Sequence, residues 1–415
     1  MKDTNLQPNK LNNPFIALRH RNFRYFSIGM TVSLIGTWMQ AVAQPWLAYT
    51  LTQSALLLSL IGALQFLPVL LFSLPAGVII DRYDKKKILI LTQSASLLIT
   101  LTLAVLVWTG HVQYWHILIM ATLLGFANTL DMPARQTFVI EMVGKEDLMN
   151  AIALNSTIFN LCRIIGPAAA GLIMGAAGVA WCFFINAVSF AAVLISLFFI
   201  RPIPQPARPP ISKKIFAEVK NGLHYIFQNP VLVESLLAVA IVGTFIPNFG
   251  VLVPVFAKTI LLQQEAGFGF LMAFIGVGSL IGAMFVASLS KCGPKRYLLT
   301  IAPFAVGLFM LLTGYTDTFW QTALLLALTG CFFVAFTSNA NSILQLNSSN
   351  EYRGRVMSVY ALVFGGSTPL GNLYAGAFAD QFSARIGFAA CGAAVLVLMV
   401  PLLIYMKRKS STWKS

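Results

Sequence analysis

One arginine lies deep inside an apolar stretch of this chain, and it is the residue best suited to bind a solute. Arg163 is about 15 residues into the run 148–176, roughly 22 Å along a helix. A charge at that depth costs about 2.5–3.5 kcal/mol to insert and normally marks an ion path, a solute path or a pair. No other apolar run carries a carboxylate at comparable depth. Its charge-assisted hydrogen bonds favour an anionic or strongly electronegative solute, unless backbone carbonyls or a carboxylate nearer the helix end satisfy it.

Further polar side chains could share that solute site. Ser156, Asn160, Arg163, Pro167 and Gly171 fall on one helical face. Amides at similar predicted depth either line a solute path or bond to a neighbouring helix, at about 1 kcal/mol or less. The predicted substrate-binding residues are Arg163, Asn160, Gln40, Gln65 and Asn248.

The elements that must position these residues are membrane-spanning helices. The chain is 58% hydrophobic and 10% charged, with a mean hydropathy of +0.78. Globular proteins average roughly 45–50% apolar and 25% charged residues. Stretches of about 20 apolar residues span a bilayer as helices, which satisfy their own backbone hydrogen bonds. Twelve spans are predicted, near 24–51, 54–80, 88–109, 113–138, 148–176, 179–200, 230–257, 266–290, 297–314, 319–346, 354–380 and 384–406.

The distribution of basic residues predicts the topology. The chain carries a net charge of +15, and 24 of its 28 Lys and Arg residues lie at the N-terminus or after even-numbered spans. This bias predicts cytoplasmic termini and contact with anionic lipids, with no nucleic-acid partner. The five cysteines lack metal-ligand spacing, so no metal site is predicted. Several tryptophans near outer span ends are expected to anchor the membrane interface: Trp38, Trp46, Trp115, Trp181 and Trp320.

A polar linker divides the chain into two halves of six spans. It starts with RPIPQPARPP and continues as a segment in which Ile215, Val219, Leu223 and Phe227 share one face, typical of an amphipathic surface helix. The loop DRYDKKK also aligns with SKCGPKR at a shift of 209 residues. The predicted parts are a cytoplasmic segment 1–23, a bundle 24–200, a linker 201–229, a bundle 230–406 and a cytoplasmic tail 407–415.

The loop after the second span carries a family motif. GVIIDRYDKKKIL, residues 77–89, resembles the major facilitator superfamily signature G-x-L-x-D-R-x-G-R-R through Gly77, Asp81, Arg82, Lys85 and Lys86. Asp84 stands where a glycine is usual. The resemblance implies the major facilitator fold, an all-α membrane protein whose twelve transmembrane helices form two six-helix bundles.

Two further segments favour the efflux branch of this superfamily. RIIGPAAAG, residues 163–171, is similar to the Gly-Pro segment of its antiporters. The similarity implies a helix hinge at Gly166, Pro167 and Gly171, because proline removes a helix hydrogen bond and small residues allow close packing. An ordinary packing patch is the alternative. The runs 130–143 and 350–371 look like the branch that contains bacterial enterobactin exporters and secretion permeases.

Charged residues near the cytoplasmic ends of the spans suggest a conformational latch. The resemblance implies that acids at the end of span 4 engage the basic loop after span 2, and the alternative is a solvated cluster worth under about 1 kcal/mol. The latch residues are Gly77, Asp81, Arg82, Lys86, Asp131 and Arg135. The candidate proton carriers are Asp131, Glu141 and Glu234, each of which would need a raised pKa.

The predicted function is secondary active transport. The chain has no GxxxxGK[ST] or HExxH motif and no nucleophile constellation, so it predicts neither an enzyme, nor a cofactor, nor ATP-driven transport. We expect a monomer in the cytoplasmic membrane that exports a small organic solute, such as a drug or siderophore, with protons as the candidate coupling ion. The alternatives are an importer or facilitator of a small anionic metabolite, and a non-transporting receptor or scaffold.

Overall fold

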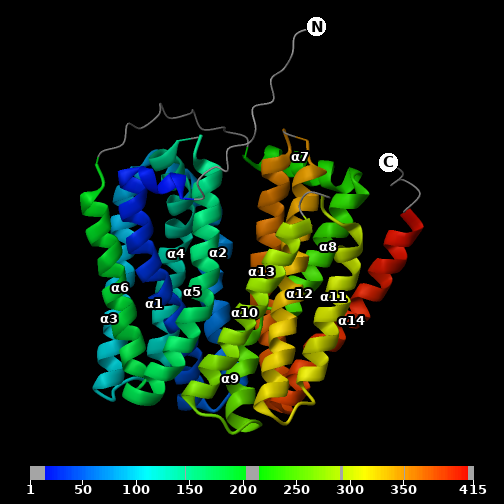
Figure 1. The fold of residues 1–415 in the computed structure, drawn as a ribbon. Coiled ribbons are helices and arrows are strands. Elements are labelled where there is room, and N and C mark those ends of the chain that lie inside the picture. The colour runs from blue at the N-terminus through cyan, green and yellow to red at the C-terminus, as the bar shows by residue number, and fades with distance from the viewer. Residues whose placement is uncertain (1–14, 145, 202–214, 290–292, 350, 410–415) are drawn as a thin grey trace.

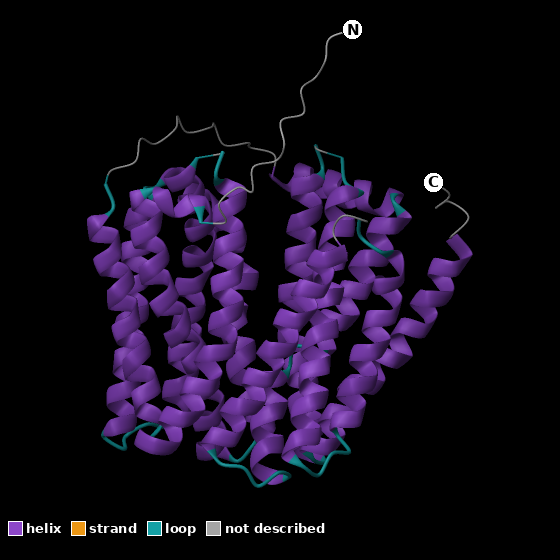
Figure 2. Ribbon diagram, viewed as in Figure 1, coloured by secondary structure: helices purple, strands orange, loops and turns teal. Residues whose placement is uncertain are grey.

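The described part of the chain is built from helices joined by short loops (Figures 1 and 2). The computed structural model describes residues 15–144, 146–201, 215–289, 293–349 and 351–409. A 3-10 helix, η1 (Ile16–Arg19), precedes α1 (Arg21–Thr52), α2 (Ala55–Arg82), α3 (Lys85–Trp108), α4 (Tyr114–Val143), α5 (Leu148–Ala177) and α6 (Val179–Phe199). After α7 (Ile215–Gln228) come α8 (Pro230–Phe245), α9 (Phe249–Thr259), α10 (Glu265–Leu289), α11 (Arg296–Thr313), α12 (Phe319–Leu346), α13 (Arg353–Gln381) and α14 (Ala384–Lys409).

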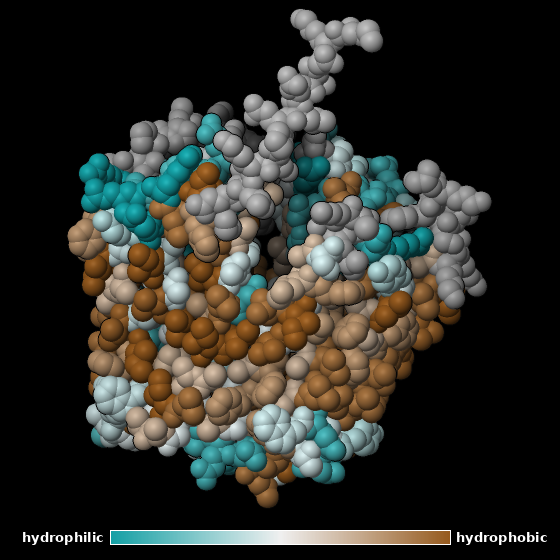
Figure 3. Space-filling model, in the orientation of Figure 1, coloured by the Kyte–Doolittle hydropathy of each residue, from teal (hydrophilic) through white to brown (hydrophobic). Residues whose placement is uncertain are grey.

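Eleven segments of this described chain are long and apolar enough to cross a membrane, counting α8 and α9 as one. Apolar side chains cover the middle of the face seen in Figure 3, and hydrophilic ones gather at its two ends. Large apolar residues such as Leu91, Phe198 and Val397 are more than 60% exposed, as expected of side chains that face lipid. The remaining long helix, α13, forms over the predicted span 354–380 but is richer in polar and small residues.

The predicted span 230–257 is two helices, because the chain breaks at residues 246–248. Pro247 has no N–H to continue the helix. The Asn248 amide then donates to the carbonyls of Thr244 at 3.1 Å and Phe245 at 3.0 Å, which satisfies groups that the break would leave free. Asn248 is fully buried and therefore serves the helix break in this conformation.

Helices α1–α6 lie on one side of Figure 1 and α8 and α11–α14 on the other, and α10 packs on α12 and belongs to this second group. Helix α1 begins and α14 finishes at one end of the molecule, which we call the terminal end; α9 and the start of α10 lie at the opposite end, the closed end. Toward the terminal end most of α13 is half-buried, and Val356 is its only buried residue between 353 and 367. Toward the closed end it buries Thr368, Gly371, Asn372, Ala375, Gly376 and Ala379.

Helix α5 shows the same change along its length. Between residues 148 and 161 only Ala151 is buried. From residue 162 onward the buried set is Cys162, Gly166, Pro167, Ala170, Gly171 and Met174. The two groups of helices are therefore packed together at the closed end and separated at the terminal end, where Figure 3 shows the molecule hollowed.

Candidate functional site

Two seams of small residues hold the groups of helices together at the closed end. In the first, Gly171 of α5 meets Gly269 of α10, where an added Cβ on Gly269 would lie 2.5 Å from the Gly171 Cα. In the second, an added Cβ on Gly376 of α13 would lie 2.6 Å from the Ser59 side chain of α2. Such contacts let helix backbones approach closely.

Arg163 lies where the α5–α10 seam begins. An added Cβ on Gly276 of α10 would lie 2.7 Å from the Arg163 carbonyl oxygen. One side of this part of α5 packs on α1 through Gly166, and another packs on α10 through Pro167 and Gly171. Arg163 lies on the helix face between these two contacts. It stands at the level above which α5 is little buried, toward the terminal end. We therefore infer that its side chain faces the inner end of the hollow.

The guanidinium of Arg163 has an aromatic neighbour. It lies over the ring of Trp38 on α1, with 5.8 Å between the guanidinium carbon and the ring centroid. Among the described side chains, no carboxylate forms an ion pair with it. This cation can therefore accept an anion without first losing a carboxylate partner.

Two other predicted substrate residues lie elsewhere on the hollow-forming helices. Asn160 is one turn from Arg163, and its amide donates to the Ser156 carbonyl of the same helix at 2.8 Å. Gln65 is half-buried, and its backbone carbonyl packs where a Cβ on Gly125 of α4 would stand at 2.3 Å. The structure does not bring Gln65 into contact with Arg163.

Gln40 belongs to a hydrogen-bonded cluster inside the first group of helices. Its side-chain oxygen accepts from Asn186 of α6 at 2.6 Å and Thr100 of α3 at 3.3 Å, and its amide donates to Gln44 at 3.2 Å. Gln40 and Asn186 are buried. In this conformation Gln40 links α1 to α3 and α6. The sequence had left this role open as the alternative to lining a solute path.

Asp131 forms a buried polar cluster between α3 and α4. It pairs with Arg135 one turn along α4, and it accepts hydrogen bonds from Thr92 at 2.8 Å and Gln93 at 2.7 Å. The Arg135 guanidinium also reaches the sulfur of Met30 on α1, at 2.8 Å. These two residues bind within the first group of helices and do not contact Arg82.

The basic loop after α2 contacts α4 through a different acid. Lys85 pairs with Glu141 at 3.1 Å, and Lys86 donates to the Ile200 carbonyl at 3.0 Å. Asp84 caps α3 by accepting from the Lys86 N–H at 2.8 Å, with a φ of −63°. The loop therefore needs no left-handed residue where the superfamily signature has a glycine.

Two members of the proposed latch, Arg82 and Gly77, show little contact here, and the hinge residues lie in an unbroken helix. Arg82 is exposed, and a Cβ on Gly77 would meet no described atom within 4 Å, so no helix approaches closely at Gly77. The side chain of Asp81 lies outside the described part of the structure. Pro167 lies within α5, which runs unbroken from residue 148 to 177, and Gly166 packs on Trp38.

Glu234 is buried in the second group of helices. Its carboxylate pairs with Arg296 of α11 at 3.2 Å, and Arg296 also donates to the Met406 carbonyl at 3.1 Å. The three candidate proton carriers, Asp131, Glu141 and Glu234, thus each have a basic partner in this conformation.

Sequence reasoning missed a set of polar contacts between the two groups at the closed end. Asp380, at the end of α13, accepts hydrogen bonds from the first N–H groups of α2, Ala55 at 2.8 Å and Leu56 at 3.4 Å. Glu265, at the start of α10, accepts from the Trp46 indole at 3.2 Å. The sequence showed only that these acids lie near the ends of apolar runs. It could not show their partners, because those come from distant segments of the chain.

The structure corrects two of the expected tryptophan anchors. Trp46 is 6% exposed; it stacks on Phe268 with 5.4 Å between ring centroids, and Lys258 lies 5.8 Å from its ring. Trp38 packs against Gly166 and Arg163. Both rings are held between helices, because they point inward from α1. A residue's distance from the end of its span does not reveal this direction.

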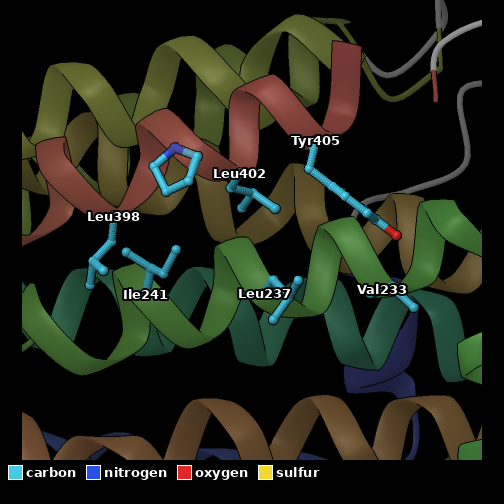
Figure 4. Close-up of a pocket in the computed structure, with 7 residues that line it drawn as sticks. Val233, Leu237, Ile241, Leu398, Leu402 and Tyr405 are labelled. Carbon is cyan, nitrogen blue, oxygen red and sulfur yellow. The ribbon is translucent and has the colours of Figure 1, made fainter. Parts of the chain in front are cut away.

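An apolar groove lies between α8 and α14, on the far side of α8 from α13 (Figure 4). Its volume is about 450 Å³. The lining residues are Val233, Leu237, Ile241, Leu398, Pro401, Leu402 and Tyr405. The groove is separate from Arg163 and contains no charged lining residue.

The sequence and the fold were compared with known proteins. Residues 12–415 match the transmembrane secretion effector family. The chain belongs to this family of major facilitator transporters. Similar proteins include a staphyloferrin A transporter of Staphylococcus aureus, 27% identical over 93% of this chain and 97% of that protein. The multidrug efflux pump Tap of Mycolicibacterium fortuitum is 25% identical, over 88% of this chain and 91% of the pump.

A further relative is named as an exporter, and two solved structures share the fold. The enterobactin exporter EntS of Shigella boydii is 25% identical over 93% of this chain and 92% of that protein. The fold is similar to the nucleoside transporter NupG, with a TM-score of 0.74, 15% identity, and 93% and 99% of the two chains covered. It is also similar to a bacterial Spinster homologue in an inward-facing conformation, with a TM-score of 0.72, 13% identity, and 93% and 95% covered. The chain is a multi-pass protein of the cell membrane.

Proposed function

We propose that this transporter exports a small organic solute by alternating access, and that Arg163 binds an anionic group of that solute. The observation that carries the proposal is the place of Arg163, at the inner end of a hollow that opens at one end only. A solute that enters from the terminal end would reach this cation at the inner end of the hollow, where the α5–α10 seam begins. The relatives named for siderophores and drugs support export of such a molecule.

The proposed architecture has twelve spans in two bundles, residues 24–200 and 230–406, joined by the linker 201–229. Helices α1 to α6 begin at residues 21, 55, 85, 114, 148 and 179, and α8 and α10 to α14 begin at 230, 265, 296, 319, 353 and 384. The second series repeats the first at a nearly constant spacing, as expected of a duplicated bundle. Helix α13 is proposed to span the membrane as well, as the eleventh of the twelve spans in chain order, because its polar face packs on α2 and α8.

The termini are proposed to be cytoplasmic, on the strength of the basic residues at the terminal end. The hollow then opens to the cytoplasm, where an exporter must take up its solute. The segments 1–23 and 407–415 extend mostly beyond the described residues, as does the start of the linker. In α7 the side chains of Leu223 and Phe227 are 38% and 74% exposed, which supports a position on the membrane surface.

The proposed energy source is a proton gradient. Asp131, Glu141 and Glu234 are the candidate carriers, and each must separate from its basic partner during the cycle to take up a proton. An ion pair that forms in one state and breaks in another biases the conformational equilibrium by its difference in energy. The latch of Asp81, Arg82, Asp131 and Arg135 is proposed on the same basis, with Lys85 and Glu141 added by their contact.

The test compares efflux of anionic catecholates, drugs and cationic dyes from cells with and without the gene, repeated for Arg163→Gln. Loss of a charged hydrogen bond of about 1.5–3 kcal/mol predicts roughly tenfold or greater loss of anion efflux, with cationic dyes less affected. Arg385→Gln is the control, because this arginine pairs with Asp317 far from the hollow. Equal losses for all solutes would remove the anion site.

Direction and coupling need a second measurement. Inverted membrane vesicles should accumulate an exported solute when their interior is acidic, and an ionophore that collapses the pH difference should stop accumulation. Accumulation only in right-side-out vesicles would indicate import. Purified protein that moves no solute in liposomes would favour a receptor or scaffold.

A further inference from the structure

We infer that the anionic group bound at Arg163 belongs to a planar aromatic molecule, whose ring Trp38 and Phe159 contact. This inference rests on the proposed function and specifies the class of its solute. It arises from the two rings beside Arg163, neither of which serves the export proposal above.

The position of Trp38 is fixed by a glycine on the neighbouring helix. An added Cβ on Gly166 would lie 2.4 Å from the Trp38 Cβ, so α1 and α5 approach closely only because residue 166 has no side chain. This contact holds the indole beside the guanidinium of Arg163. A cation over an aromatic face is attracted to it, and Trp38 therefore also fixes where Arg163 presents its N–H groups.

Phe159 extends the aromatic surface toward the terminal end. Its ring meets Trp38 edge to face, with 5.5 Å between centroids and an interplanar angle of 68°. Phe159 precedes Arg163 by four residues, hence lies on the same face of α5, and it is 44% exposed. The two rings and the guanidinium thus form one continuous surface at the inner end of the hollow.

This aromatic surface favours a solute that carries a ring. A ring that stacks or meets edge to face with aromatic side chains gains energy beyond its buried area, which an aliphatic anion of equal size does not.

The test uses three probes of matched size: benzenesulfonate, cyclohexanesulfonate and benzyltrimethylammonium. The sulfonates stay ionised and do not cross lipid unaided, so binding to the purified transporter in lipid nanodiscs can be measured directly. We expect benzenesulfonate to bind roughly fivefold more tightly than cyclohexanesulfonate, and both to bind more tightly than the cation. Equal binding of the two sulfonates, or binding of neither, overturns the inference.

Variants locate the effect. Trp38→Leu should abolish the preference for the aromatic sulfonate, Trp38→Phe should keep most of it, and Phe159→Leu should reduce it. Trp181→Leu is the matched control, since Trp181 packs on Trp108 with 5.2 Å between ring centroids, within the first group of helices. A preference that survives Trp38→Leu, with a normally folded protein by size-exclusion chromatography, also overturns the inference.

Arg163→Gln separates this inference from the proposed function. One outcome is that Arg163→Gln loses binding of both sulfonates while Trp38→Leu changes the binding of both by the same factor. The anion site then stands and the aromatic class is wrong. If Arg163→Gln leaves sulfonate binding unchanged, the anion site itself is wrong and the aromatic inference fails with it.

Discussion

At the scale of residues, an ionised side chain in a membrane protein is informative through its partners. Glu141 and Glu234 each have a basic partner, and Asp131 has Arg135 and two further donors. Breaking such a pair leaves a buried charge and is costly, so these acids contribute to structure in this conformation. Arg163 differs in having an aromatic neighbour and no described carboxylate partner, which is why we place the solute there.

Asp147 provides a residue-scale prediction outside the spans. Hydrogen bonding from His20 at 2.6 Å, followed by the charge of Arg19 at 2.9 Å, lowers the pKa of Asp147 below its ordinary value of 3.8. The ionised acid therefore stabilises the attachment of η1 to α5 at neutral pH. That contribution is complete above the ordinary pKa and is lost as the pH falls through the lower folded one.

Hydrogen exchange of the segment 15–24 measures this attachment. Asp147→Asn should speed exchange at pH 7, and the difference from the parent protein should shrink as the pH falls below about 3.8 toward the lower folded pKa, after correction for intrinsic rates. Asp317→Asn should have no effect on this segment. A difference that did not shrink as the pH fell below 3.8 would show that the carboxylate charge is not responsible.

Residue positions that depend only on helical periodicity were predictable from the sequence. Arg163 and Asn160 share a face of α5 because residues three or four apart always do. Gln40 and Asn248 could not be interpreted from depth alone. Their partners, Asn186 of α6 and the carbonyls of the α8–α9 break, depend on which helices lie next to them and where a helix ends.

At the scale of elements, the α5–α10 seam depends on glycine. Its backbones are so close at Gly171 and Gly269 that a side chain on either has no space. The small residues after Pro167 were visible in the sequence as a packing patch. Their partner was not, because nothing in the first half of the chain specifies a glycine about 100 residues later.

Gly269→Ala should open this seam. Its Cβ would lie 2.6 Å from the Pro167 carbonyl oxygen, and overpacking of this kind typically costs about 1–3 kcal/mol. The seam exists only while the closed end is shut, so the variant should raise the population of the open state by roughly tenfold. Hydrogen exchange of residues 265–272 measures the change.

The matched control is Gly175→Ala, also on α5, where an added Cβ meets no described atom within 4 Å. It should leave exchange in the seam unchanged. If Gly269→Ala exchanged no faster than this control, the close approach of α5 and α10 would not be holding the closed end.

At the scale of the whole molecule, the two ends are stabilised in different ways. At the terminal end the described ion pairs lie within one group of helices, as with Lys85 and Glu141 or Glu234 and Arg296. At the closed end Asp380 and Glu265 bind across the two groups. The proposed alternating access requires the second kind of contact to break, so these two acids should set how readily the closed end opens.

The two-bundle plan stays a prediction, which rests on the hydropathy and basic loops that repeat along the chain. The conformation could not be predicted, since a transporter that works by the proposed alternating access must form both an open and a closed terminal end. Which state is observed depends on small energy differences between seams that meet only in three dimensions.

Asp380→Asn tests the control of the closed end. The carboxylate accepts from the first two N–H groups of α2, where the helix dipole also favours a negative charge. An amide keeps the shape but loses the charge, and hydrogen bonds to charged groups contribute about 1.5–3 kcal/mol. We therefore expect the amides of Ala55 and Leu56 to exchange roughly tenfold faster in the variant, with no change in the segment 15–24.

Asp317→Asn is the appropriate control for this last experiment. Asp317 also lies near the closed end, but its partner Arg385 belongs to the same group of helices, so its loss should not release α2. Glu265→Gln removes the charge from the second contact across the groups, and its effect should add to that of Asp380→Asn because the two acids contact different helices. Unchanged exchange at Ala55 in the double variant would mean that the glycine seams alone hold the closed end, and that the acids there do not control its opening.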